Sequence, residues 1–96
     1  MVHAGKDKTN ASVISALARA EALIMYLSAQ GVSVQGVSLR HAQPVIRIAR
    51  CAWCETIKKQ GKARFDHHGH DRFGRFRQGV YTDESGCRVV WSESIH

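Results

Sequence analysis

A chain of 96 residues has room for a single modest hydrophobic core, so we expect one domain spanning residues 1–96. Its hydrophobic fraction of 44% and charged fraction of 23% are typical of a globular protein and exclude a disordered chain. The 14 Lys and Arg residues outnumber the 8 Asp and Glu residues, and the net charge of +6 favours a polyanionic partner.

The first predicted element is a helix over residues 10–30. Residues 1–8 are polar and we expect them to be flexible, whereas residues 9–12 offer side chains that can cap a helix. Gly31 is a typical helix-ending residue. Apolar residues recur at spacings of three and four, which places them on one helix face: Val13, Leu17, Ala20, Ile24 and Leu27.

The helix is followed by a predicted β-hairpin with strands near residues 32–40 and 45–50. Apolar and polar residues alternate in both segments, and residues 41–44 have the composition of a turn. The alternation changes phase at Gly36, which indicates a β-bulge or kink.

A second predicted hairpin has strands near residues 76–82 and 87–92, joined by a polar loop that ends at Gly86. The fold class is therefore α+β, with one N-terminal helix packed on a four-stranded antiparallel sheet made of the two hairpins. The predicted core contains Val13, Leu17, Ile24, Leu27, Val34, Ile46, Ile48, Val89 and Trp91.

Between the hairpins, residues 51–57 suit one short helix, and residues 58–77 have the character of a long basic insertion loop. Half of the 14 Lys and Arg residues lie in this loop, interleaved with Phe and Gly, a mixture that suits phosphate contact and base stacking. The alternative is a solvated insertion whose Phe side chains fold back onto the core. The predicted partner-binding residues are Lys58, Lys59, Lys62, Arg64, Arg72, Phe73, Arg75, Phe76 and Arg77.

Two of the three cysteines, Cys51 and Cys54, have the spacing of one half of a zinc site. The possible completing ligands are Cys87, His41, His67, His68 and His70, and we take His68 and His70 as the expected pair, with His67 and His70 as the alternative. A second close Cys/His pair of the usual kind is missing, and buried thiols are common core residues, so we expect no resident cofactor and keep zinc as the alternative. A redox pair is disfavoured, because it requires a helix start after a strand in a βαβ context and this chain is mostly antiparallel.

The run from His67 to Asp71 contains groups that suit acid–base chemistry, but no nucleophile motif or second carboxylate pair accompanies it. We therefore expect a binding protein rather than an enzyme. The longest apolar run, residues 22–27, is too short to cross a bilayer, so we expect no membrane partner and a cytoplasmic location. The oligomeric state is left open.

Three segments resemble small accessory proteins of temperate phages and prophages, the class that includes anti-CRISPR proteins: residues 31–34 with Arg40, residues 44–48, and residues 86–91. The resemblance covers the two hairpins and leaves Cys51, Cys54 and the basic insertion outside. It implies a non-enzymatic protein, in the host cytoplasm, that blocks a host nucleoprotein or defence complex by occupying an acidic surface. The alternative function is a basic DNA- or RNA-binding module, stabilised by zinc if the metal site forms.

Overall fold

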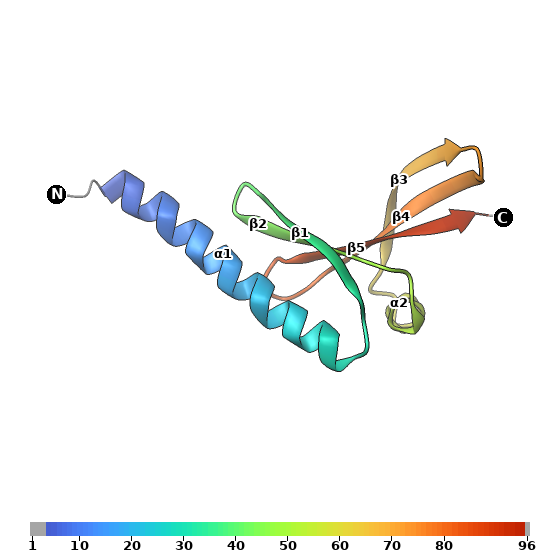
Figure 1. Cartoon of the computed structure of the whole chain (residues 1–96), viewed down its shortest axis with the longest axis horizontal. Coiled ribbons are helices and arrows are strands. Elements are labelled where there is room, and N and C mark those ends of the chain that lie inside the picture. The colour runs from blue at the N-terminus through green and yellow to red at the C-terminus, as the bar shows by residue number, and fades with distance from the viewer. Residues whose placement is uncertain (1–3, 96) are drawn as a thin grey trace.

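The computed structural model describes the backbone of residues 4–95 and the side chains of residues 10–95. It confirms the α+β class: a long N-terminal helix, a short second helix and a twisted sheet (Figure 1). The elements in chain order are α1 (Ala4–Ala29), β1 (Val34–Arg40), β2 (Gln43–Ile48), α2 (Ala52–Lys59), β3 (Arg64–Asp71), β4 (Gly74–Thr82) and β5 (Arg88–Ile95).

The sheet has five strands in the order β1-β2-β5-β4-β3, so the predicted four-stranded antiparallel sheet is wrong in its details. Three neighbouring pairs are antiparallel, whereas β2 and β5 at the centre run parallel. The parallel pair arises because α2, β3 and β4 carry the chain across the sheet before β5 returns beside β2.

The predicted loop over residues 58–77 is also wrong, because this segment contains the end of α2, all of β3 and the start of β4. Strand β3 lies at the edge of the sheet, and most of its residues are exposed or half-buried. An edge strand of this kind needs little apolar surface. Its sequence is therefore mostly polar and lacks the apolar alternation from which a strand is predicted.

The turns of both predicted hairpins are confirmed. The register between β1 and β2 shifts between Val34 and Gly36, as the change of phase predicted. His41 and Ala42 form the following turn with φ angles of 50° and 61°, and Gly86 has a φ of 89° in the loop before β5. The carboxylate of Asp83 stabilises that loop by accepting backbone hydrogen bonds from residues 85 and 87 at 2.9 Å.

Helix α1 begins at Ala4, earlier than predicted, and Gly31 follows its end with a φ of 78°. Residues 4–8 therefore belong to the helix, and residues 1–3 of the predicted flexible segment lie outside the described residues. The predicted burial of Val13 and Leu17 is wrong, since they are 38% and 53% exposed. The buried stripe consists of Ala16, Ala20, Leu23 and Leu27.

Two overlapping apolar stripes run along α1, and periodicity alone does not decide between them. Alanines at 16 and 20 allow the helix to approach the sheet closely, and the larger Leu17 remains outside. Figure 1 shows the N-terminal part of α1 extending beyond the sheet. Residues Asn10–Ala29 are long and apolar enough to cross a membrane by length and composition, although the longest uninterrupted apolar run is short, and a core helix can meet the same criterion.

One core joins both helices to the same face of the sheet. Leu27, Ile46, Ile48, Val89 and Trp91 are buried as predicted, whereas Ile24 and Val34 are partly buried at the core's edge. From α2, Trp53 packs edge-to-face against Tyr81 and Trp91, with ring centroids 5.5 and 6.4 Å away. Because the core occupies this helix-side face, the strand residues of opposite orientation form an open face.

Candidate anion-binding face

Four arginines project from the open face of the sheet. A row of paired residues runs from Arg47 on β2 through Val90 and Val80 to Arg64 on β3, and paired strand residues point to the same face. Arg88 lies two residues before Val90 and shares its face, opposite the buried Val89. We call the set the open-face arginines: Arg40, Arg47, Arg64 and Arg88.

Three of these arginines meet at one hollow of about 340 Å³. Every ionisable side chain among its described lining residues is an Arg or a His, and none is a carboxylate. The lining residues come from all five strands: Ser38, Arg40, Val45, Arg47, His67, Gln78, Arg88 and Val90. Such a set offers several N–H donors to an oxyanion and no competing acid.

A bulge in β3 brings His67 to this hollow. The register between β3 and β4 shifts between Asp66 and Gly69, and His67 has a left-handed φ of 48°. A bulge changes the direction of the side chains in this way, so the consecutive residues Asp66 and His67 lie on the same side of the strand. The Nε2 atom of His67 lies 3.9 Å from a carboxylate oxygen of Asp66.

A chain of hydrogen bonds holds part of the face in place. Arg47 donates to the Oε1 atom of Gln78 at 3.2 Å, and the amide of Gln78 donates to Asp66 at 3.1 Å. These contacts link β2, β4 and β3 across the outer side of β5. Arg47 is exposed, so its remaining N–H groups are directed at solvent or a ligand.

The turn between β3 and β4 brings together three of the predicted partner-binding residues, Phe73, Arg75 and Phe76, around a hollow of about 390 Å³. Phe73 is 84% exposed, and the guanidinium of Arg72 lies 4.9 Å from the centre of its ring. The ring of Phe76 lies directly on Gly69, where it leaves no room for a Cβ atom. Phe73 is therefore the accessible aromatic and Phe76 is partly used in packing.

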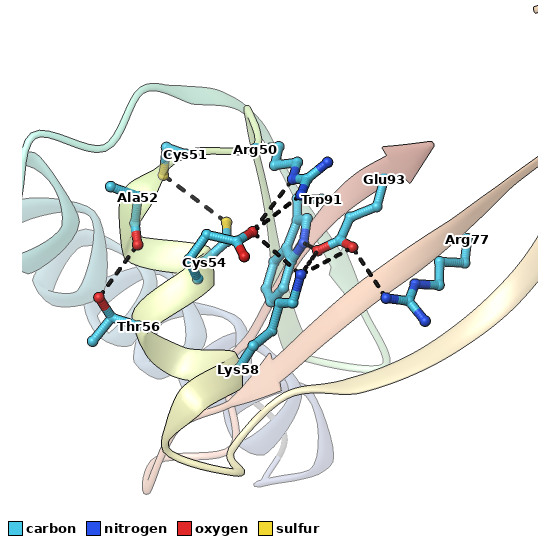
Figure 2. A network of polar contacts seen from close by, with 10 residues as sticks. Arg50, Cys51, Ala52, Cys54, Thr56, Lys58, Arg77, Trp91 and Glu93 are labelled. Carbon is cyan, nitrogen blue, oxygen red and sulfur yellow. Dashed lines mark hydrogen bonds and ion pairs between the residues drawn. The ribbon is translucent and has the colours of Figure 1, made fainter. Parts of the chain in front are cut away.

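Two other predicted residues, Lys58 and Arg77, bind an internal carboxylate on the helix-side face (Figure 2). Glu93 on β5 is 3% exposed and accepts a hydrogen bond from the indole of Trp91 at 2.8 Å. The Nζ atom of Lys58 lies 3.2 Å, and a guanidinium nitrogen of Arg77 3.3 Å, from its oxygens. We call these residues the Glu93 cluster: Glu93, Lys58, Arg77 and Trp91.

The charge of Glu93 is stabilised by its surroundings. Burial alone would raise its pKa, but hydrogen bonds from Trp91 and Lys58, the Lys58 charge and the Arg77 hydrogen bond lower it below the ordinary value. Arg77 also stacks on Phe65, with 3.7 Å between the guanidinium and the ring centre. The geometry therefore assigns Lys58 and Arg77 to the protein's own packing.

The remaining predicted cations do not form one surface. Lys59 and Lys62 are exposed at and after the end of α2, on the side of the helices. Arg64 belongs to the open face, and Arg72 and Arg75 lie at the turn between β3 and β4. These cations are close in the sequence but lie on different parts of the molecule, because they occupy a helix end, an edge strand and a turn.

The proposed zinc ligands are brought together only in part. The sulfur atoms of Cys51 and Cys54 lie 3.9 Å apart at the start of α2. His68 and His70 lie on β3, and among residues whose side chains are described no group of three or more His, Cys, Asp and Glu is placed to hold a metal. The zinc alternative therefore has half of a ligand set in this structure.

Arg40, Arg47 and Arg88 were not among the binding residues predicted from the sequence. Each occupies a polar position in a segment that was predicted to be a strand, and this alternation is the signal that would have revealed them. Their convergence depends on the strand order, which brings β5 beside β2. Comparisons of the chain with models of protein families, with curated proteins and with solved structures found no match.

Proposed function

We propose that this protein is a nucleic-acid-binding module that holds a phosphate backbone on the open face of its sheet. The observation that carries the proposal is the hollow where Arg40, Arg47, Arg88 and His67 converge, with no carboxylate among the described residues that line it. Arginine forks match phosphate oxygens in geometry and charge. The net charge of +6 supplies long-range attraction to the same ligand.

The distribution of the arginines favours an extended polyanion over a small anion. Arg47 and Arg64 are separated by the two strands between them, roughly 14 Å at about 4.8 Å per strand spacing. Between them lie Val90 and Val80, which are buried and carry no charge. A nucleic-acid strand laid across the sheet can place two non-adjacent phosphates of its backbone near the two arginines, and exposed Phe73 at the turn provides a stacking surface.

Fluorescence anisotropy with labelled single- and double-stranded DNA and RNA, at several salt concentrations, tests this proposal. We expect affinity to fall steeply with salt, and Arg47→Ala with Arg88→Ala to weaken binding and flatten the salt dependence. Each lost phosphate contact reduces the logarithmic slope by about 0.7–0.9. Lys59→Ala with Lys62→Ala is the control with the same change in charge, and should retain most of the slope.

Equal effects of the two double variants would contradict a role for the open face. Unchanged binding by the arginine double variant would reject the hollow as the site. Circular dichroism and thermal unfolding of both variants establish that they fold. Because Arg47 is exposed and Arg88 is half-buried, we expect little change in either measurement.

The phage-type inhibitor function remains a separate proposal, as does the cytoplasmic location. An inhibitor of a host nucleoprotein would be retained by an acidic protein surface and ignore free nucleic acid. A pull-down from host lysate, with and without nuclease, separates the two functions. Loss of all captured material after nuclease treatment supports direct nucleic-acid binding. Capture of a nuclease-resistant assembly at moderate salt, together with no binding to the labelled oligonucleotides, supports the inhibitor.

A further inference from the structure

The start of α2 brings two thiols face to face. Cys51 is the N-cap residue of α2, and the backbone N–H of Cys54 donates to the carbonyl of Cys51 at 3.0 Å. Their sulfur atoms lie 3.9 Å apart, and the dashed line in Figure 2 marks this non-covalent contact at the start of the helix. A disulfide needs about 2 Å between the sulfur atoms, so a small side-chain movement separates the two states.

The fold supplies part of the context of a redox pair, a helix start after a strand, whereas the strand that follows α2 is the antiparallel edge strand β3. Strand β2 ends at Ile48 and α2 begins at Ala52, so the cysteine pair does lie at a helix start directly after a strand. That strand is paired in parallel with β5. The objection that the chain is mostly antiparallel therefore applies only to the strand after α2, because the strand before it belongs to the one parallel pair of the described sheet.

The two thiols differ in their access to solvent. Cys51 is half-buried and within reach of a small molecule, whereas Cys54 is fully buried on the side of α2 that faces the core. Burial, followed in smaller measure by the neighbouring Cys51 and Glu93, raises the pKa of the Cys54 thiol to about 12. An external reagent therefore meets Cys51 first, and Cys54 reacts only with what Cys51 has bound.

We propose that Cys51 and Cys54 form a redox-active dithiol that reduces low-molecular-weight disulfides and is itself converted to a Cys51–Cys54 disulfide. This inference is independent of nucleic-acid binding, because the pair lies at the helix side and the arginines on the open face. It is also independent of a metal, since the reaction needs the two thiols and an external disulfide alone.

The exchange proceeds in two balanced steps. Cys51 gives up its proton to solvent, and its thiolate attacks one sulfur of the external disulfide to form a mixed disulfide. The released thiolate takes up a proton from solvent and becomes the first thiol product. Cys54 then attacks the Cys51 sulfur, breaks the mixed disulfide, and its proton is transferred to the departing thiolate. In sum, the two protein thiols lose two hydrogen atoms and are oxidised, and the external disulfide is reduced to two thiols.

Incubation of the whole protein with glutathione disulfide, in the presence of a chelator, tests the proposal. We expect the wild-type chain to keep one of its three thiols when titrated in denaturant, and mass spectrometry to show a Cys51–Cys54 link. Trp53 lies between the two cysteines, so oxidation should also change tryptophan emission. Reduction with dithiothreitol should restore both signals.

Three serine variants assign the roles. Cys51→Ser should not react, whereas Cys54→Ser should accumulate the mixed disulfide with glutathione at Cys51. Cys87→Ser removes a buried cysteine outside the pair and should behave like the wild type. If Cys54→Ser does not fold, the contrast between Cys51→Ser and Cys87→Ser still decides the question.

Retention of all three thiols by the wild type across a range of glutathione ratios would overturn the proposal. A Cys51→Ser variant that oxidises at the wild-type rate would also overturn it. So would a disulfide that links two chains or that includes Cys87 in place of either partner.

Discussion

Arg77 and Glu93 face each other across β4 and β5, and a guanidinium nitrogen of Arg77 lies 3.3 Å from a carboxylate oxygen of Glu93. The same carboxylate binds Lys58 of α2 at 3.2 Å, so one buried anion connects the short helix to two strands. Hydrogen bonds from Lys58, Arg77 and the Trp91 indole satisfy its charge. This arrangement makes Glu93 a structural residue despite its charge.

Glu93→Gln should destabilise the protein, because Lys58 and Arg77 would lose their common counter-ion while the amide still fits the site. The two cations are partly solvated, with side chains 23% and 34% exposed, so we expect a loss of about 1–3 kcal/mol. Urea unfolding followed by tryptophan fluorescence measures it. Glu55→Gln is the control at an exposed partner of Lys58, and an equal loss there would contradict the special role of Glu93.

Stability should decrease at acid pH through Glu93. Its pKa is lowered in the folded state from an ordinary value of 4.5, so below pH 4.5 the unfolded chain takes up a proton first. The stabilisation is therefore complete above this pH and is lost as pH falls towards the folded-state pKa. Urea midpoints measured from pH 7 to pH 3 should fall less steeply for Glu93→Gln than for the wild type, and parallel curves would reject this assignment.

Two leucines of α1 should respond differently to the same truncation. Leu27→Ala creates a cavity at a fully buried position and should cost about 2–5 kcal/mol. Leu17 is 53% exposed, so Leu17→Ala should cost less than about 1 kcal/mol. Chemical unfolding of the two variants compares them directly. A larger loss at Leu17 would show that its face of α1 is covered in solution.

Gly79→Ala should be poorly tolerated, because a Cβ atom at this position would overlap the indole ring of Trp91 on the neighbouring strand. Overpacking of this kind costs about 1–3 kcal/mol. Gly36→Ala is the matched control, since nothing lies within 4 Å of its added Cβ atom. Thermal unfolding should separate the two variants, and equal melting temperatures would contradict the close contact between Gly79 and Trp91.

Much of the candidate site could not be predicted from local sequence patterns. The sequence places Lys58, Arg64 and Arg77 along one basic stretch. It did not reveal that Lys58 and Arg77 bind Glu93, because that contact joins residues 35 and 16 positions apart. Nor did it reveal that Arg64 shares a face with Arg47, since their common row crosses four strands.

Local sequence patterns predict the α+β class, the long helix, the two hairpin turns and the burial of Ile46, Val89 and Trp91. These features follow from spacing and turn residues, which act between near neighbours in the chain. The face of α1 that packs on the sheet, the strand order and the parallel pairing of β2 with β5 follow from the three-dimensional fold. These outcomes depend on which distant apolar faces are buried together, and that competition among long-range contacts is not encoded in any local period.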